Sequence, residues 1–277
     1  MLKIAFQGER GAYSETASKK MFNENILISP SFSFEEVFTK VKNNLVDYGV
    51  IPIENSLYGS VFESYDLLLQ YSLTIVGELN LQINHHLLAN KNYELKEIKK
   101  VYSHPQALGQ CSIFLKSLKN AEIIPAYDTA GSALLLLNNK EMPVAAIASR
   151  EAADIYKLKI LKSNIQNNQE NFTRFLAVSR KKIKKEFKNP KTSICFELKS
   201  MPGALFRALS VFALRDIDLM KIESRPIPHK PFEYNFYLDM KGSLSDDKIK
   251  KALNHLAEIS LSIKEFGTYE VGKTYKS

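Results

Sequence analysis

The sequence predicts an α/β protein with a large N-terminal region and a smaller C-terminal βαββαβ domain. Short apolar runs alternate with segments of helical periodicity from Leu2 to Val178, the pattern of a sheet that helices cover on both faces. Beyond a basic stretch the order becomes strand, helix, strand, strand, helix, strand, which is a ferredoxin-like plan. We therefore expect a first region at 1–180, a basic linker at 181–191 and a second domain at 192–277. A chain of 277 residues has room for two or three such parts.

Six short apolar runs in the first region are predicted to be strands, because each is bounded by polar or turn-forming residues. They are Ile4–Phe6, Tyr48–Ile51, Thr74–Val76, Lys99–Tyr102, Ile123–Ile124 and Val144–Ala148. Apolar residues repeat at helical spacing from Phe34 to Val41 and from Ala107 to Leu118. These stripes are expected to face the core.

The second domain is expected to contain four strands and two helices. The strands are predicted at 193–198, 218–224, 232–239 and 261–266, and the helices at 203–214 and 245–259. Ser245 is expected to cap the last helix, because Asp246 and Asp247 follow it and an apolar face begins at Ile249.

Composition and charge favour an ordinary globular protein that binds a small molecule. The chain is 45% hydrophobic and 25% charged, with a formal net charge of +8. The stretch from Arg180 to Lys191 holds many of the excess cations and lacks the aromatics that stack on single strands, so nucleic-acid binding is not predicted. The remaining positive balance can steer a small dianion. No apolar run approaches the roughly 18 residues of a membrane span, and no signal-peptide core follows Met1, so we expect a cytoplasmic protein without a membrane partner.

The cysteines and histidines suggest neither a metal site nor covalent catalysis. Cys111 and Cys195 form no CxxC pair and are expected to be reduced packing residues. His85 and His86 are adjacent and would point oppositely on a strand, and the other histidines lack ligand spacing. We therefore predict no metal and no cofactor.

A glycine-containing motif, Gly8 to Glu15, lies where the first strand passes into a helix. Backbone N–H groups at such a position can hold an anion. The motif lacks the GK[ST] of a phosphate loop and the GxGxxG of a dinucleotide fold. A tight turn without a ligand explains it equally well.

Three further motifs combine amides, hydroxyls and charged groups after apolar strands. The first, Pro52 to Val61, follows a strand at the end where ligands bind in α/β sheets. The second, Ser103 to Cys111, starts a helix with an early Pro and places Gln106 and Gln110 on one helix face. Each has an alternative structural explanation, namely turn residues that satisfy their own backbone and a helix capped by a serine.

The third polar motif, Asn171 to Phe175, is expected to lie on a strand. There Thr173 and Phe175 would share one face and Arg174 would oppose them. A buried threonine beside an arginine at the rim is the structural alternative.

Five motifs in order resemble those of the prephenate dehydratase family. They are GERGAYSE at Gly8, PIENSLYGSV at Pro52, SHPQALGQC at Ser103, AAIASREAA at Ala145 and NFTRF at Asn171. The resemblance implies two α/β lobes of the periplasmic-binding-protein kind with an active site in the cleft, followed by an ACT regulatory domain. Because the motifs begin at Gly8, we expect the monofunctional form without a chorismate mutase domain.

The resemblance also assigns roles to particular residues. It implies catalytic roles for Thr173, Asn55, Ser103 and Gln110. Substrate contacts are expected from Ser56, Gln106, Thr129, Arg174 and Phe175. In the ACT-like domain, L-phenylalanine is expected to bind at Gly203, Ala204, Leu205, Asp218, Leu219, Glu223, Ser224, Arg225 and Pro226. Relatives usually carry asparagine at the position of Asp218. Pairing of ACT domains implies a homodimer or homotetramer.

The implied reaction is the loss of CO2 and water from prephenate to give phenylpyruvate, and it requires neither a redox cofactor nor a metal. The leaving hydroxyl needs hydrogen-bond donors, which Thr173, Asn55, Ser103 and Gln110 can supply. An alcohol is a weak acid, so Thr173 is expected to act as a donor or relay. Two alternatives stay open: a non-catalytic sensor, and an arogenate dehydratase that performs the same elimination on an amino acid.

Overall fold

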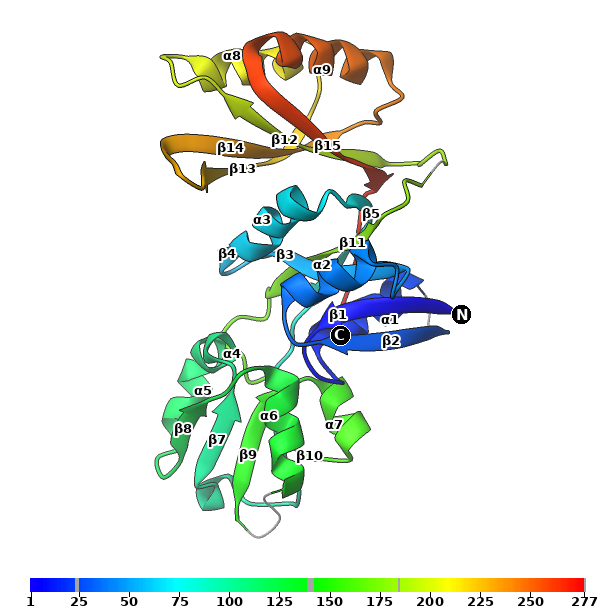
Figure 1. Ribbon diagram of the computed structural model, residues 1–277. Helices are drawn as coiled ribbons and strands as arrows, with labels where there is room; N and C mark the ends of the chain where they lie inside the picture. The colour runs from blue at the N-terminus through cyan, green and yellow to red at the C-terminus, as the bar shows by residue number, and fades with distance from the viewer. Residues whose placement is uncertain (23–24, 139–141, 184, 277) are drawn as a thin grey trace. The chain divides into compact units, whose positions relative to one another are not determined.

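The computed structural model describes residues 1–22, 25–138, 142–183 and 185–276 (Figure 1). The chain divides into two compact units. The first contains Met1–Val61, Leu79–Phe175 and Thr274–Ser277, and the second contains Phe62–Glu78 and Leu176–Lys273. The first unit carries all the residues for which the sequence predicts catalysis or substrate binding.

The first lobe is built on a sheet with the strand order β16-β5-β11-β3-β1-β2, and β4 pairs with β3. The strands are β1 (Leu2–Gln7), β2 (Ile26–Ser31), β3 (Tyr48–Asn55), β4 (Gly59–Ser60), β5 (Thr74–Gln82), β11 (Phe172–Ser179) and β16 (Lys273–Tyr275). β1 is parallel to β2 and to β3. Helix α1 (Tyr13–Phe22) contributes Ala17 to a core with Ile4 and Val50. Helix α2 (Phe34–Lys42) buries Val37, Phe38 and Val41 and contacts β1 and β3.

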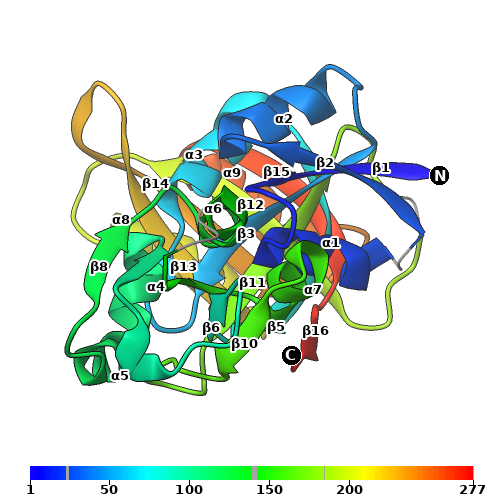
Figure 2. The same cartoon turned by 90° about the horizontal axis from the view of Figure 1, so that it is seen from below.

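The second lobe contains a five-stranded sheet with the order β10-β6-β9-β7-β8. Its strands are β6 (His86–Ala89), β7 (Lys100–Ser103), β8 (Glu122–Pro125), β9 (Val144–Ala148) and β10 (Lys159–Lys162). Its helical segments are η1 (Leu95–Glu97), α4 (Pro105–Gln110), α5 (Ser112–Ser117), α6 (Thr129–Leu135), η2 (Leu136–Asn138) and α7 (Arg150–Tyr156). Helices α4 and α5 lie beside β8 in both views (Figure 1, Figure 2).

Strand β9 shows why this sheet is buried on both sides. Ala145 and Ile147 pack in one cluster with Ala107 of α4 and with Cys111, the C-cap residue of that helix. The alternate residues, including Ala146, pack in a second cluster with residues of α6 and α7. This follows from the period of two along a strand, which sends successive side chains to opposite faces. A strand buried on both faces is apolar throughout, as 144–148 is.

The chain passes between the two lobes twice, from β5 to β6 and from β10 to β11. The two crossing segments are connected, because the Ile83 N–H donates to the Asn171 carbonyl at 2.8 Å and the Ile165 N–H donates to the His85 carbonyl at 2.9 Å. The predicted two-lobed α/β fold class is confirmed.

The C-terminal domain has the predicted βαββαβ order: β12 (Pro190–Leu198), α8 (Ala204–Ala213), β13 (Leu219–Ile227), β14 (Lys230–Lys241), α9 (Asp247–Ile259) and β15 (Ser260–Glu270). Its strands pair antiparallel in the order β13-β14-β12-β15. Ile194 and Phe196 of β12 pack against Phe212 of α8 and Leu256 of α9, so both helices cover one face.

Helix α3 (Phe62–Tyr71) belongs to the same unit as this domain and contacts its sheet. The hydroxyl of Tyr237 donates to the Tyr65 carbonyl at 3.0 Å, and the two rings lie 4.7 Å apart. Lys264 of β15 donates to the carbonyls of Leu68 and Leu69 near the end of α3. The opposite face of the sheet is therefore in contact with α3, which the sequence assigned to the first region.

All six strands predicted in the first region are confirmed, but several boundaries and caps differ. The stripe from Ala107 to Leu118 does face a core, yet Cys111 interrupts the helical backbone and separates α4 from α5. Helix α4 is capped by His104 and not by a serine. Helix α9 has Asp246 at its N-cap position instead of Ser245. The third predicted strand of the C-terminal domain, 232–239, extends at both ends to Lys230–Lys241, because β13 and β14 form a long hairpin.

The basic stretch is exposed over most of its length but ends in buried structure. Strand β12 begins at Pro190, and the Lys191 ammonium lies 2.8 Å from the Glu78 carboxylate. Both side chains are buried, with 5% and 1% of their surfaces exposed. Removing one partner of such a pair leaves a buried charge uncompensated. Lys191 is therefore a structural cation of the second unit.

Candidate active site

Asn55, the last residue of β3, has a side-chain amide whose orientation is set by the backbone. Its Oδ1 accepts hydrogen bonds from the N–H groups of Leu57 and Tyr58 at 3.0 and 3.1 Å. Its Nδ2 must then face the other way, where it donates to Asn171 Oδ1 at 2.8 Å and to Thr173 Oγ1 at 3.0 Å. The turn thus satisfies its own backbone, as the structural alternative predicted, and the same amide also contacts Thr173.

The bond from Asn55 determines what Thr173 can do. Thr173 lies in β11 with 9% of its surface exposed. Because its oxygen accepts from Asn55, its own hydroxyl hydrogen is available as a donor. Among the residues that the structure describes, no acceptor takes that hydrogen. Accepting one hydrogen bond polarises a hydroxyl and strengthens the bond that it donates.

Asn171 extends the network to the second lobe. Its Oδ1 accepts from Asn55, so its Nδ2 faces Gln110 and donates to Gln110 Oε1 at 3.1 Å. The same Oε1 lies 2.6 Å from His85 Nε2. Gln110 is the last residue of α4 and is buried. Its Oε1 is therefore occupied by two neighbours, which leaves the Nε2 amide hydrogens as donors.

The far end of the network is formed by Tyr13 of α1. The Tyr13 hydroxyl lies 3.0 Å from His85 Nδ1 and 2.8 Å from the Asn84 carbonyl. Burial raises the pKa of this hydroxyl well above its usual value, so it keeps its proton. Burial also lowers the pKa of His85 to about 4, which makes its ring neutral at pH 7. The network from Thr173 to Tyr13 is therefore uncharged at neutral pH.

Two pockets lie near these residues in the first unit. The smaller, about 380 Å³, is lined by network residues and their neighbours: Leu57, Tyr58, Gln110, Gln166, Asn167, Asn168 and Asn171. The larger, about 850 Å³, lies along α1 and α7 and is lined by residues such as Lys19 and Arg150. The larger one contains no residue for which the sequence predicts catalysis or substrate binding. We assign the site to the smaller pocket, because Gln110 and Asn171 line it.

The other predicted site residues differ in burial and in their hydrogen-bond partners. Ser103 is fully buried, and its hydroxyl donates to the Ile147 carbonyl at 2.7 Å, outside the network described above. Gln106 is exposed although Gln110, one helical turn later, is buried. Thr129 is the first residue of α6 and is partly exposed. Ser56 ties the β3 turn to β11, because its hydroxyl donates to the Glu170 carbonyl and accepts from the Phe172 N–H, both at 2.9 Å.

Arg174 and Phe175 differ in what they offer a ligand. The Arg174 Nε lies 3.4 Å from a Glu54 carboxylate oxygen, and 13% of the Arg174 side chain is exposed. Phe175 is buried in the core with Ile4 and Val50, with 3% of its surface exposed. Because its ring is packed in this core, we do not include Phe175 among the residues that contact a substrate. Thr173 and Phe175 do share the buried side of the strand, as predicted.

The Gly8 to Glu15 motif forms a contact between the lobes instead of an anion site. The Gly11 N–H donates to a Glu15 carboxylate oxygen at 2.8 Å, so the chain supplies its own anion. A Cβ on Gly11 would lie 2.6 Å from the Ala152 Cα of α7, and the Gly11 φ of +88° favours glycine. The Ser149 hydroxyl donates to the Gly11 carbonyl at 2.7 Å.

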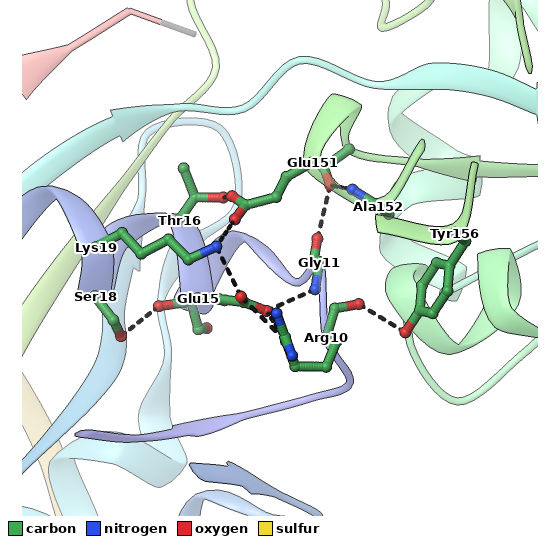
Figure 3. A network of polar contacts seen from close by, with 11 residues as sticks. Arg10, Gly11, Glu15, Thr16, Ser18, Lys19, Glu151, Ala152 and Tyr156 are labelled. Carbon is green, nitrogen blue, oxygen red and sulfur yellow. Dashed lines mark hydrogen bonds and ion pairs between the residues drawn. The ribbon is translucent and has the colours of Figure 1, made fainter. Parts of the chain in front are cut away.

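Ion pairs surround this contact (Figure 3). Lys19 lies 2.9 Å from Glu15 on α1 and also pairs with Glu151 of α7. Thr16 of α1 donates to the same Glu151, and the Arg10 Nε lies 3.2 Å from Glu15. The charged groups between the lobes thus gather at α1 and α7, whereas the network at Thr173 consists of neutral groups.

Sequence reasoning missed the linking residues of the network. Asn171 was noted within NFTRF but was given no role, although it is fully buried between Asn55 and Gln110. His85 was considered only as a metal ligand, and Tyr13 only as part of a turn motif. No group of three or more potential metal ligands occurs in the described parts of the chain, and none of their helices is long and apolar enough to cross a membrane.

The residues predicted to bind an effector lie in two segments of the C-terminal domain. Gly203 is the N-cap of α8 with a φ of +75°, followed by Ala204 and the partly exposed Leu205. Asp218 directly precedes β13, which begins at Leu219. The remaining predicted residues lie within β13, which continues to Ile227: Glu223, Ser224, Arg225 and Pro226.

Arg225 has partners inside its own unit. Its guanidinium lies 2.8 Å from the Asp66 carboxylate of α3 and 4.3 Å from the centre of the Phe62 ring. Glu223, two residues earlier, lies 3.6 Å from the Lys221 ammonium. Arg225 therefore anchors the first turns of α3 to β13.

The fold and site together define a two-lobed α/β protein with a neutral, donor-rich polar network and a ferredoxin-like domain at its C-terminal end. The family model described as prephenate dehydratase matches residues 4–183. An Arabidopsis thaliana relative, "Arogenate dehydratase/prephenate dehydratase 2, chloroplastic", is 43% identical over 99% of this chain and 74% of its own length. The chain belongs to the prephenate dehydratase family.

Two solved structures are similar over nearly the whole chain. The prephenate dehydratase of Arthrobacter aurescens in complex with L-Phe has a TM-score of 0.89 and 30% identity, covering 98% of this chain and 90% of that one. GqqA, described as a novel type of quorum quenching acylase, has a TM-score of 0.88 and 28% identity, covering 96% of this chain and 97% of that one.

The hydrogen bonds and ion pairs of the Glu15 carboxylate predict a pH-dependent contribution to stability. Burial alone would raise the pKa of Glu15, but Lys19, the Gly11 N–H and Arg10 outweigh burial and lower the pKa below its ordinary value of 4.5. A lowered folded-state pKa stabilises the protein above the unfolded value, and this contribution is lost as the pH falls through the folded value. We expect Glu15→Gln to unfold at a lower temperature than wild type at pH 7, with a difference that shrinks below about pH 4.5.

Calorimetry of thermal unfolding across this pH range measures the effect. Glu258→Gln is the matched control, since Glu258 is exposed near the end of α9 and has no ion pair with the described residues. A difference between Glu15→Gln and wild type that stays constant down to pH 3 would contradict the assignment.

Proposed function

We propose that the chain catalyses the decarboxylating dehydration of prephenate to phenylpyruvate. One observation carries the proposal: a single neutral network holds two unused donors, the Thr173 hydroxyl and the Gln110 amide. The backbone N–H groups of the β3 turn orient the Asn55 amide, and this orientation determines that both groups act as donors. Membership of the prephenate dehydratase family supports the same reaction.

The electron flow of this reaction explains why neutral donors suit it. The bond between the ring and its carboxylate breaks and CO2 leaves, while the bonding electrons enter the ring. The C–O bond then breaks, and the oxygen leaves with its electron pair and takes up a proton to become water. Negative charge therefore moves from the carboxylate to the leaving oxygen, and donors at that oxygen are bonded more strongly in the transition state.

Thr173 and Gln110 serve as the donors in this proposal. Thr173 is too weak an acid to transfer a proton outright at neutral pH, so it acts as a donor or as a relay from solvent. Asn55 strengthens it by donating to its oxygen. Ser103 is assigned a supporting role only, because its hydroxyl hydrogen is directed to Ile147.

Arg174 is proposed to position the substrate instead of stabilising the transition state. The pyruvyl carboxylate of prephenate keeps its charge throughout, so a cation near it aids orientation equally before and during the reaction. The Glu54 carboxylate balances the Arg174 guanidinium. The same proposal includes substrate contacts from Ser56, Gln106 and Thr129.

Arogenate is the alternative substrate, because the Arabidopsis relative carries both activities in its name. The elimination is chemically the same, and the two substrates differ at the keto or amino group of the side chain. That relative is also named as chloroplastic, so the predicted cytoplasmic location stays a prediction.

Regulation by L-phenylalanine at the C-terminal domain is part of the proposal. The first turn of α8 leaves backbone N–H groups without intrahelical acceptors, which can bind the effector carboxylate. The solved Arthrobacter relative contains L-Phe. We also propose that the ACT-like domains pair, giving a homodimer or homotetramer. Arg225 acts here as an anchor of α3 and not as a direct ligand.

The first expected outcome is turnover of prephenate by the purified protein without added nucleotide. Phenylpyruvate formation is followed by its absorbance at alkaline pH, and arogenate is assayed in parallel for phenylalanine. Addition of EDTA is expected to leave the rate unchanged. Rates equal to the enzyme-free rates with both substrates would refute the proposed function.

The second expected outcome concerns Thr173→Val, which removes the hydroxyl and keeps the shape. We expect kcat to fall by roughly 10²-fold or more with little change in KM, as for other deleted transition-state donors. Thr173→Ser keeps a hydroxyl and is the matched control, with activity close to wild type. Arg174→Ala should mainly raise KM. A near-normal kcat in Thr173→Val would show that Thr173 is not the required donor and would leave Gln110 in that role.

The third expected outcome is that Gly203→Ala weakens L-phenylalanine binding at least several-fold in calorimetry. Apart from Gly203 and its chain neighbours, no atom of the described residues lies within 4 Å of the new Cβ, but it would project beside the helix start at a φ of +75°. Gly59→Ala is the matched control, because Gly59 has a φ of +78°, equal free space and a position in the first unit. Equal affinity in both variants and wild type would place the effector elsewhere.

A further inference from the structure

His85 lies between the two lobes, in the segment that connects β5 to β6. Its N–H donates to Gln166 Oε1 at 3.0 Å and its carbonyl accepts from the Ile165 N–H at 2.9 Å. The two crossing segments therefore hold its backbone, and only 2% of the residue is exposed. Its ring contacts Tyr13 edge to face, with the two planes at 82°. A histidine held in this way has a fixed ring orientation.

The network also determines which ring nitrogen carries the proton. Two backbone N–H groups bind Asn55 Oδ1, so Asn55 must donate to Asn171 Oδ1. Asn171 must then donate to Gln110 Oε1. The same Oε1 lies 2.6 Å from His85 Nε2. Because Oε1 carries no hydrogen, the contact is a hydrogen bond only if Nε2 is the donor. His85 Nε2 therefore carries the hydrogen.

The other ring nitrogen then accepts a hydrogen bond. A neutral imidazole has one N–H, so Nδ1 of His85 is an acceptor. The Tyr13 hydroxyl lies 3.0 Å from this nitrogen and 2.8 Å from the Asn84 carbonyl, so its single hydrogen lies between two acceptors. From the β3 turn to His85 each donor thus orients the next side chain, and the assignment of the hydrogen to Nε2 does not depend on which acceptor Tyr13 binds.

We propose that His85 is a positioning residue for the dehydration, which holds Gln110 Oε1 through its Nε2–H and so keeps the Gln110 amide nitrogen facing the pocket. The inference rests on the proposed function, in which that nitrogen is a donor to the leaving hydroxyl. Without His85, Asn171 alone would bind Oε1, and the amide could rotate and present its oxygen to the substrate. An acceptor at that place would oppose the developing negative charge.

Three substitutions separate the role of the Nε2–H from a general packing role. His85→Gln places an amide nitrogen near the original Nε2 and can still donate to Gln110. His85→Asn is shorter and cannot reach, and His85→Leu fills the space without a donor. We expect kcat to fall roughly 10- to 10²-fold in His85→Asn and His85→Leu, with a smaller change in KM, as for other misplaced catalytic groups. His85→Gln should recover kcat to within a few-fold of wild type.

Unfolding temperatures of the three variants are measured alongside kcat to detect a folding defect. Wild-type kcat in His85→Leu would overturn the proposal. So would a His85→Gln variant that folds like wild type but is as slow as His85→Leu.

The tautomer of His85 is measured directly in the wild-type protein, independently of any activity. Ring 15N shifts are assigned to His85 by comparison with His85→Gln, and the Nε2–H pattern is expected at pH 7. An Nδ1–H pattern would overturn the inference even if the enzyme turns prephenate over. Conversely, an Nε2–H pattern in a protein without dehydratase activity would leave the hydrogen-bond assignment intact and refute the proposed function alone.

Discussion

The orientation of one amide, that of Asn55, determines the chemistry of the whole polar network. Two backbone N–H groups of the following turn bind its oxygen, so its nitrogen must face Asn171 and Thr173. Each hydrogen bond broken inside such a buried network is costly, since an unpaired polar group costs about 1–3 kcal/mol. Reversal of Asn55 would break three bonds at once, those with the Leu57 and Tyr58 N–H groups and with Asn171 Oδ1. The turn geometry therefore fixes donors at Thr173 and Gln110.

The network at Thr173 is neutral, whereas a group of ion pairs connects α1 to α7. The ion pairs of Glu15, Lys19 and Glu151 connect α1 to α7, and Gly11 permits the close approach of the two elements. The network at Thr173 has no ionised member. A decarboxylation moves negative charge away from a carboxylate, and a cation beside that group would bind the ground state more tightly than the transition state. Under the proposed function, the ion pairs between α1 and α7 are not among the neutral donors that act on the leaving hydroxyl.

Much of this arrangement could be predicted from the sequence, because strands and helices follow from local periodicity. The apolar run 144–148 predicted a strand, and Gly203 predicted a helix start. What the sequence could not show depended on contacts between distant residues. The Gly8 to Glu15 motif looked like an anion site because its anion, Glu15, is one of its own residues. His85 gained its role only when folding placed Gln110, 25 residues later, beside its ring.

The domain to which helix α3 belongs also could not be predicted from the sequence. The sequence places it in the first region, directly after the β3–β4 turn that orients Asn55, yet it packs with the C-terminal sheet. Arg225, in the segment predicted to bind an effector, holds the first turns of α3 through Asp66 and Phe62. The chain itself thus connects β13 to the turn at Asn55, through α3 and Val61. Arg225 and the turn at Asn55 are therefore connected by contacts within the second unit and by the continuous chain from α3 to Val61.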